Sequence, residues 1–217
     1  MQFIDWGLID YEVAFEKQKQ LNLQAQQDKS KQAIIFCQHP SVVTYGRTTD
    51  ADDYADWKEK KVEVDRGGKA TYHGPNQLVV YPIIDIEKLT IRGIPPRNIK
   101  CYLNFLENLT IEVLGSLDIQ GERISKVKNS ETGEELLGTG VWVGSKKIAS
   151  VGIAVKKWVT MHGLALNVEP LPSKLSLLRP CGFQAEQMTS VSDVLGRDVK
   201  VEEMKQLFVS AFKEKLI

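Results

Sequence analysis

Cysteine is scarce in this sequence and is not arranged for structural use. The three cysteines, Cys37, Cys101 and Cys181, are odd in number, and no two of them are spaced as Cys-x-x-Cys. A disulfide framework pairs all of its cysteines, and a cysteine zinc site needs clustered ligands. We therefore expect no structural disulfides, no metal site and a reducing compartment, the cytoplasm.

Long apolar runs and an excess of one charge are absent too. No segment approaches the roughly 20 apolar residues of a membrane-spanning helix, and residues 1–9 lack the basic start and apolar centre of a signal peptide. The 28 basic residues balance 28 acidic ones, so bulk electrostatic attraction to nucleic acid is not expected. These absences predict a cytoplasmic protein that binds neither nucleic acid nor membrane.

Motifs of the common nucleotide and hydrolase sites are missing as well. The one Gly-Lys pair, Gly68-Lys69, has Glu63 where a phosphate loop requires glycine. No run of glycines fits the dinucleotide fingerprint, and neither His-Glu-x-x-His nor Gly-x-Ser-x-Gly occurs. The sequence thus predicts no ATP, dinucleotide or metal cofactor.

What is present is an ordinary globular composition arranged as helices around strands. Of the 217 residues, 42% are hydrophobic and 26% charged, and no linker or internal repeat divides them, which predicts one domain over residues 1–217. Amphipathic spacing predicts helices over 11–25, 95–115 and 201–212, a short polar helix over 50–61 and a brief helix after Ser190. Apolar runs and alternation predict strands at 3–8, 33–37 and 78–86, and several within 119–168. Because the helices bracket a strand-rich middle, we expect an α+β fold with a mixed, largely antiparallel sheet flanked by helices.

Three segments are unusual for a purely structural protein, and the first is residues 66–77, RGGKATYHGPNQ. Paired glycines let the backbone approach a ligand closely, and Gly74-Pro75 marks a sharp turn after His73. A hairpin loop with a buried Tyr72 explains this segment alone equally well.

The second segment is residues 147–167, which we interpret as two strands joined by a turn at 156–157. Small residues cluster at Ser150 and Gly152 and again at Gly163 and Ala165. Small side chains on facing strands leave a groove that an apolar chain can fill. Lys147 begins the first strand, where a solvated lysine is the commoner occurrence.

The third segment is Pro180-Cys181-Gly182, which places a cysteine in a rigid, partly exposed turn. By contrast, Cys37 ends an apolar strand and Cys101 lies in a predicted helix, so we expect both to be buried and inert. A nucleophilic cysteine needs access and a stabilised thiolate, so Cys181 is the better candidate.

Together and in this order, the three segments resemble the lipoyl(octanoyl) transferases, which are related to the lipoate and biotin protein ligases. The resemblance extends from about Phe36 to Gln187. It implies an acyltransferase of lipoate biosynthesis and a biotin/lipoate protein ligase-like fold, with one octanoyltransferase domain over the whole chain and no cofactor. The implied donor is octanoyl-acyl carrier protein. The implied acceptors are lipoyl domains of 2-oxoacid dehydrogenase complexes and the glycine cleavage H protein.

The resemblance also implies the site residues. Its catalytic cysteine and lysine match Cys181 and Lys147, not Lys146. Its acyl-substrate pocket matches Arg66, Gly67, Gly68, Lys69, Ala70, Thr71, Tyr72, His73, Ser150, Val151, Gly152, Gly163, Leu164 and Ala165. Asn76 departs from the usual glycine, but asparagine tolerates positive φ better than most residues, so the loop should still form.

Two alternatives remain open on the same residues. An ATP-dependent lipoate or biotin protein ligase would share the fold but does not need a covalent cysteine. A binding module that has lost catalysis would not need both Cys181 and Lys147. The role of Lys147 is also open: an ammonium ion beside the thiol would favour thiolate, and a neutral amine would accept a proton.

Overall fold

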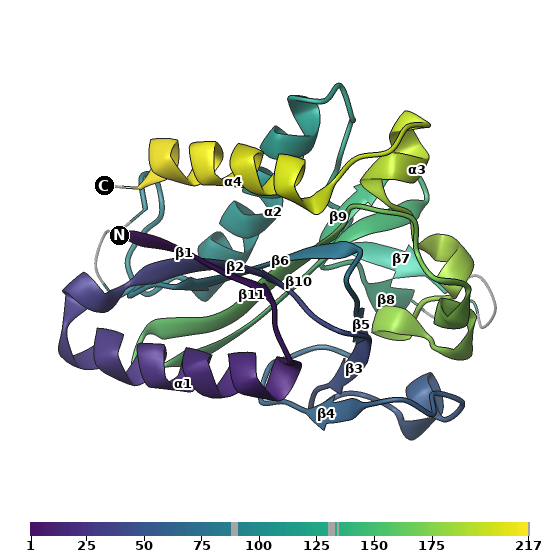
Figure 1. Ribbon diagram of the computed structural model, residues 1–217, viewed down its shortest axis with the longest axis horizontal. Helices are drawn as coiled ribbons and strands as arrows, with labels where there is room; N and C mark the ends of the chain where they lie inside the picture. The colour runs from purple at the N-terminus through teal and green to yellow at the C-terminus, as the bar shows by residue number, and fades with distance from the viewer. Residues whose placement is uncertain (88–90, 130–132, 134, 217) are drawn as a thin grey trace.

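The protein is described by a computed structural model covering residues 1–87, 91–129, 133 and 135–216. Its main sheet has six strands in the order β1-β2-β6-β11-β10-β9 (Figure 1). β1 and β2 are parallel and the other neighbours are antiparallel. The predicted mixed, largely antiparallel sheet is thus confirmed. The strands are β1 (Gln2–Leu8), β2 (Ala33–Gln38), β6 (Gln77–Ile83), β9 (Gly140–Val143), β10 (Lys146–Lys156) and β11 (Val159–Asn167).

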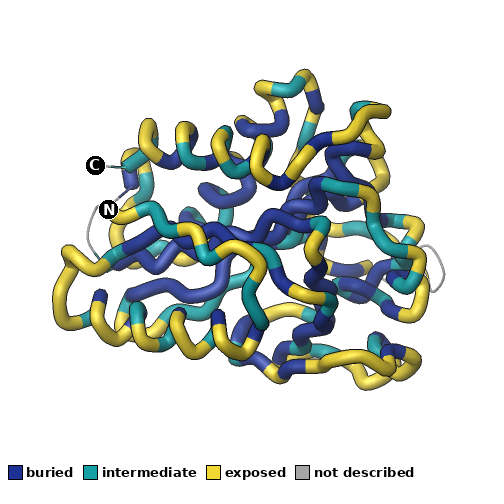
Figure 2. Tube along the Cα trace, in the orientation of Figure 1, coloured by how far each residue is buried: buried dark blue, intermediate teal, exposed yellow. Residues whose placement is uncertain are grey.

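Helices cover both faces of this sheet (Figure 1). α1 (Tyr11–Gln27) lies on one face, and α2 (Ile99–Gly115) and α4 (Val201–Lys215) lie on the other. Each face buries its own apolar cluster against its helices, so the sheet is the buried centre of the molecule while the outer helix surfaces are exposed (Figure 2). In the part of the chain that is described, no helix is long and apolar enough to cross a membrane.

Helix starts follow local capping chemistry. The Asp10 side chain accepts the N–H groups of residues 12 and 13, and that of Asn98 accepts the N–H of residue 101. Ser190 caps α3 (Val191–Leu195), and Gly196, with a φ of 64°, ends it. These side chains satisfy N–H groups that have no partner inside the helix, which is why the predicted helices near these residues are present.

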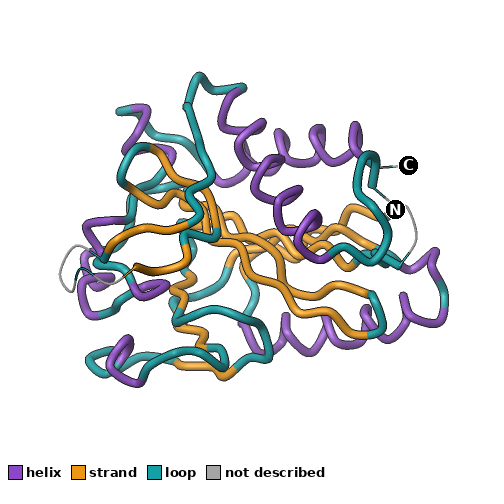
Figure 3. The backbone as a smooth tube through the Cα atoms, turned by 180° about the vertical axis from the view of Figure 1, so that it is seen from behind, coloured by secondary structure: helices purple, strands orange, loops and turns teal. Residues whose placement is uncertain are grey.

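Two smaller sheets lie beside the main one (Figure 3). The first contains β3 (Val42–Tyr45), β4 (Lys61–Glu63) and β5 (Thr71–His73), and the second contains β7 (Lys126–Lys128) and β8 (Glu135–Leu137). β5 falls inside the segment predicted as a loop. Its pairing with β3 is a long-range contact, which local sequence does not specify.

The predicted helix over 50–61 is wrong. Only a single 3-10 turn, Ala51–Tyr54, forms there. Trp57 is 1% exposed, and its indole N–H donates to the carbonyl of Lys60 at 3.2 Å. Burying this side chain turns the chain back toward β4, so tertiary packing overrides the helical pattern.

Candidate active site

A cavity of about 570 Å³ lies between the main sheet and the loop that precedes β5. Ligand pockets typically have volumes of about 300–1,000 Å³. The structure brings most of the predicted site residues to its wall. These are Arg66, Gly67, Gly68, Lys69, Thr71, His73, Lys147, Ser150, Val151, Gly152, Gly163, Leu164, Ala165 and Cys181.

Ala70 and Tyr72 do not line this cavity. Residues alternate between two faces along β5, so Thr71 and His73 face the cavity while their neighbours face away. Tyr72 packs edge-on against Trp57, with ring centroids 5.8 Å apart. Ala70 instead supports the site through its backbone, because its carbonyl accepts the N–H of Cys181 at 2.6 Å.

The turn Pro180–Gly182 holds Cys181 in an unusual backbone conformation. Cys181 has a φ of 59° and a ψ of 20°, in the left-handed region that is disfavoured for residues with a side chain. Gly182 follows at a φ of 81°, and a Cβ there would lie 2.7 Å from Cδ of Lys69. The Asn129 amide fixes this turn by donating to the carbonyl of Gly182 at 2.8 Å. The turn is therefore rigid and aims a half-buried thiol at the cavity.

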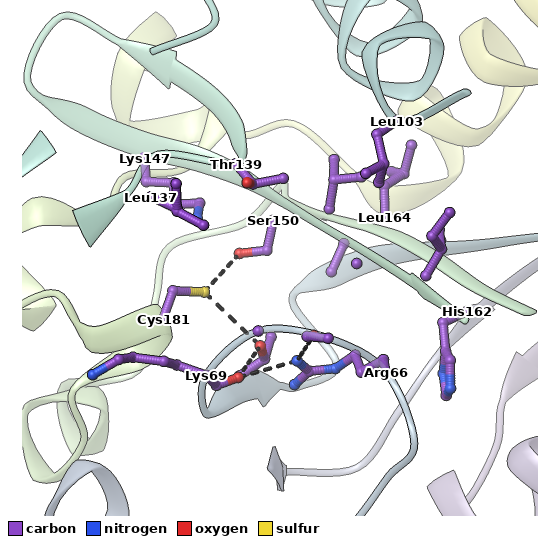
Figure 4. Close-up of a pocket in the computed structure, with 18 of the residues that line it drawn as sticks. Arg66, Lys69, Leu103, Leu137, Thr139, Lys147, Ser150, His162, Leu164 and Cys181 are labelled. Carbon is purple, nitrogen blue, oxygen red and sulfur yellow. Dashed lines mark hydrogen bonds between the residues drawn. The ribbon is translucent and has the colours of Figure 1, made fainter. Parts of the chain in front are cut away.

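Two hydroxyl groups surround the sulfur (Figure 4). The Sγ of Cys181 lies 3.4 Å from Oγ of Ser150 and 3.9 Å from Oγ1 of Thr71. Burial raises the pKa of the Cys181 thiol, but the charge of Lys147 and the hydroxyl of Ser150 lower it, and the pKa falls below its usual value. This environment favours the thiolate, which is the nucleophilic form.

Lys147 is buried, with 2% of its surface exposed, while Lys146 is exposed. The pairing of β10 with β9 shifts register between Lys147 and Ala149. This irregularity turns Lys147 inward beside the core. Its amine lies 5.7 Å from the ring centre of Trp142 and 5.4 Å from that of Phe183. None of the described residues forms an ion pair with Lys147, so its charge acts on the cavity without a neighbouring counter-charge.

Gly140 permits the close approach of β9 to β10 beside Lys147, a role that the sequence analysis missed. Its φ is 126°, and a Cβ there would collide with the carbonyl of Ala149 and would also lie 2.7 Å from Cε of Lys147. Its N–H donates to a carboxylate oxygen of the buried Glu107 at 2.8 Å. A requirement for close packing between two strands leaves no local signal in the sequence.

Arg66 organises the glycine loop instead of presenting a free cation. Its guanidinium is buried and donates to the carbonyls of Gly67 and Lys69, both at 3.0 Å, and to Oγ1 of Thr44 at 2.8 Å. The glycine at position 68 has a φ of 91°, which allows the loop to close around this group. The loop is thus a structured wall of the cavity.

The two facing glycines of β10 and β11 have different roles. A Cβ at Gly152 would contact Cδ of Arg66 at 3.4 Å, an ordinary packing distance, so its missing side chain leaves space in the cavity. A Cβ at Gly163 would collide with the carbonyl of Val80 and with Cδ of Pro82 at 2.7 Å. The prediction that both glycines exist to form an apolar slot is therefore wrong for Gly163, which permits the close approach of β6.

Buried aromatic and histidine side chains close the inner end of the cavity. His162 lines it and is unusual in having a φ of 58°. Its Nε2 lies 3.3 Å from a carboxylate oxygen of Asp65, and its ring stacks on Phe15. Burial lowers the pKa of both His73 and His162, which keeps these rings neutral. Among the described residues, no group of three or more His, Cys, Asp or Glu side chains is placed to hold a metal ion.

Comparison with known proteins adds three findings. The family model described as the lipoyl protein ligase A/B catalytic domain matches residues 10–213. An octanoyltransferase of Bdellovibrio bacteriovorus is 43% identical over 205 residues, which cover 94% of this chain and 93% of that protein. A crystal structure of a lipoate-protein ligase A bound with ATP has a TM-score of 0.68 at 17% identity, covering 98% of this chain and 84% of that one.

A more distant structural likeness is to a biotin protein ligase of Aquifex aeolicus. Its TM-score is 0.51 at 10% identity, with 99% of this chain and 68% of that one covered. These likenesses confirm the predicted biotin/lipoate protein ligase-like fold.

Proposed function

Because the chain belongs to the lipoyl protein ligase A/B catalytic-domain family, we propose that Cys181 carries an octanoyl group from a donor thioester to an acceptor lysine. The chain is an octanoyltransferase, an acyltransferase of protein lipoylation, since relatives with that name match nearly its whole length. One observation supports the covalent role. Cys181 lines the cavity beside two hydroxyls and a buried lysine, whereas Cys37 and Cys101 do not line it.

In the first half-reaction, octanoyl-acyl carrier protein is the donor. The Cys181 thiolate attacks the thioester carbonyl carbon, a new C–S bond forms, and the carrier leaves as a thiolate that takes up a proton. Thioester exchange changes free energy little, so the S-octanoyl enzyme retains the activation of the acyl group. The ammonium form of Lys147 stabilises the attacking thiolate, as its effect on the pKa of Cys181 indicates.

In the second half-reaction, the amine of the target lysine attacks the S-octanoyl carbonyl. An amide C–N bond forms, the C–S bond breaks, and Cys181 departs as thiolate. The amine loses one proton and the thiolate gains one, and Lys147 lies in the cavity wall to relay it. The proposed acceptors are lipoyl domains of 2-oxoacid dehydrogenase complexes and the glycine cleavage H protein.

Forming an amide from a thioester is energetically downhill, so this route needs no ATP. The ATP-bound ligase shares the fold at 17% identity, which makes an acyl-adenylate route the alternative.

An assay with two donors distinguishes these routes. We expect transfer to a lipoyl domain from octanoyl-acyl carrier protein without ATP, and no transfer from free octanoate with ATP and Mg²⁺. Transfer that requires octanoate and ATP would contradict the proposal.

A further inference from the structure

The backbone of Lys147 is held on both sides, but on one side the contact does not come from a strand of the main sheet. On the β9 side its partner is Trp142, and this ladder becomes irregular between Lys147 and Ala149. The β10–β11 ladder begins only at Ala149, opposite Leu166. Met188 lies beside Lys147 in an isolated parallel bridge. Since β9 occupies one side of Lys147, Met188 takes the place that β11 would otherwise fill.

Thr189 connects Lys147 to the end of β11. The N–H of Thr189 donates to the carbonyl of Lys147 at 3.0 Å. The carbonyl of Thr189 accepts the side-chain amide of Asn167, the last residue of β11, at 2.9 Å. Both Thr189 and Asn167 are buried, where a hydrogen bond is stronger than in water. The Asn167 side chain therefore acts on the backbone of Lys147 through one intervening residue.

Gln77 fixes the orientation of the Asn167 amide. The two residues lie opposite each other in β6 and β11. The side-chain amide of Gln77 donates to Oδ1 of Asn167 at 2.9 Å and to the carbonyl of Tyr72 at 3.1 Å. Its Oε1 faces His73, whose Nδ1 lies 3.2 Å away. Because a donor occupies Oδ1 of Asn167, the amide nitrogen is the group left to face Thr189. Donor and acceptor thus match at each link from His73 to Thr189.

These polar residues lie behind Cys181 and outside the main cavity. Gln77, Asn167 and Met188 line a second cavity of about 20 Å³, and Cys181 and Ser150 line both cavities. A space of that size has room for about one water molecule, so it cannot hold an acyl chain. Neither Gln77 nor Asn167 lines the main cavity. Any effect of these two residues on the reaction must therefore pass through their neighbours.

The position of Lys147 matters because its charge acts on the nucleophile. Burial raises the pKa of the Cys181 thiol, and the charges of Lys147 and, to a lesser extent, Arg66 lower it. Coulomb interactions weaken with distance and are strong where water is excluded. Arg66 is fixed independently by its hydrogen bonds to the glycine loop. A shift of the Lys147 backbone would move its amine relative to the sulfur and change the stability of the thiolate.

We propose that Asn167 is a positioning residue, which holds the backbone of Lys147 through its hydrogen bond to Thr189. In this arrangement the Lys147 amine stays fixed in the cavity wall that it shares with Cys181. Gln77 acts one step further away, by keeping the Asn167 amide in the orientation that this bond requires. The inference rests on the proposed function, because that reaction is what the positioned lysine serves. The state of the thiol can be measured without an acyl donor, so the two proposals can fail separately.

Alkylation of Cys181 by iodoacetamide at a series of pH values tests the proposal, because the thiolate is the reactive form. Peptide mass measurement separates the Cys181 product from those of the other cysteines. Asn167→Leu keeps the size of the side chain and removes its amide. We expect half-maximal alkylation at a higher pH than in wild type. Acylation by octanoyl-acyl carrier protein at neutral pH should fall by up to about 100-fold, the cost of a displacement of about 1 Å. An unshifted alkylation profile in folded Asn167→Leu would overturn the proposal.

Asn22→Leu is the matched control for the loss of a buried amide. Asn22 is also buried, and its amide donates to the carbonyls of Val159 and Thr160, at the other end of β11, at 3.0 and 3.2 Å. This variant should have a lower melting temperature, as Asn167→Leu should, but its alkylation profile should match that of wild type. Equal shifts of the profile in the two variants would show that Asn167 serves the fold alone.

Combination with Lys147→Met separates positioning of the lysine from a direct effect on the thiol. Without the amine, Asn167 has nothing to position. Adding Asn167→Leu to Lys147→Met should therefore leave the alkylation profile of Lys147→Met unchanged. A further shift as large as the one in the wild-type background would contradict the proposal.

Gln77→Met provides a second variant if Asn167→Leu does not fold. It removes the amide that orients Asn167, so the alkylation profile should shift in the same direction by a smaller amount. A profile identical to that of wild type would then overturn the proposal. Wild-type protein that is alkylated at Cys181 but never acylated by the donor would instead refute the proposed function, while the alkylation profiles would still decide the role of Asn167.

Discussion

At the residue scale, the lowered pKa of the Cys181 thiol depends on the charge of the buried Lys147, which forms no ion pair with any residue that the structure describes. Lys147 is buried beside the rings of Trp142 and Phe183, where water screens its field poorly. Burial alone would keep the Cys181 thiol protonated, but the field of Lys147 and the hydroxyls beside the sulfur reverse that effect. The neighbours of the sulfur, and not its exposure, therefore favour the thiolate.

Lys147→Met tests this dependence, because methionine keeps an apolar stem and removes the amine. We expect acylation and transfer to fall by about 10²- to 10⁴-fold, the usual range for a lost proton-transfer group. The pKa of Cys181 should rise, so the acidic limb of the acylation rate against pH should move to higher pH. Stopped acylation reactions at a series of pH values measure both.

Lys146→Met is the matched control. Lys146 is exposed and lies outside the cavity wall, so this variant should behave like wild type. A nearly normal Lys147→Met together with an inactive Lys146→Met would show that the functional lysine had been assigned to the wrong position.

At the scale of elements, the β10–β11 hairpin combines a cavity wall with a packing contact. Gly152 faces the Arg66 loop across open space, while Gly163 faces the backbone of β6. Two glycines directly opposite each other in register thus serve different purposes. The two glycines differ because a Cβ at Gly152 would meet only the Arg66 side chain at packing distance, whereas a Cβ at Gly163 would collide with the backbone of β6.

Substitutions at these two glycines should distinguish a loss of cavity space from a loss of fold stability. Gly152→Val fills cavity space, so it should reduce octanoyl transfer more than transfer of a shorter acyl group, with each excluded methylene contributing about 0.8 kcal/mol. Gly163→Val collides with β6, so it should destabilise the fold by about 1–3 kcal/mol and reduce transfer of all acyl groups alike. Thermal melts beside a chain-length series make the comparison. A stable Gly152→Val with equal losses at every chain length would contradict the cavity assignment.

At the scale of the whole molecule, the sequence was informative where local chemistry decides structure. The capping residues Asp10 and Ser190, and the turn around Cys181, each have a signal within a few positions, and the structure contains them. Long-range requirements left no such signal. The close approach of β6 that Gly163 permits, and the placement of His162 in the cavity wall beside Asp65 and Phe15, both depend on segments distant in sequence.

All three histidines of the chain are buried in one region, and this makes the fold sensitive to acid. Burial lowers the pKa of His39 from 6.5 to about 4, and its ring nitrogens contact the carbonyl of Ile9 at 2.7 Å and the hydroxyl of Tyr81 at 2.8 Å. The unfolded chain binds a proton at this histidine below pH 6.5, while the folded protein resists doing so. Stability therefore falls as pH decreases from 6.5 toward 4, and levels off below that range.

Denaturant unfolding at neutral and mildly acidic pH measures this effect. We expect His39 to contribute a loss of about 2 kcal/mol in the free energy of unfolding between pH 7 and pH 5. In His39→Gln, the difference between the two pH values should shrink by that amount, even if the variant is less stable at both. An unchanged difference would show that His39 does not control the acid sensitivity.

The covalent role of Cys181 is the central claim, and intact-mass measurement tests it most directly. Wild-type protein mixed with octanoyl-acyl carrier protein, without acceptor, should gain the mass of one octanoyl group, and neutral hydroxylamine should remove it. Cys181→Ser should show no hydroxylamine-sensitive adduct. Two results would contradict the covalent role: a wild-type protein that is never modified but still transfers the octanoyl group, or a hydroxylamine-sensitive adduct that persists in Cys181→Ser.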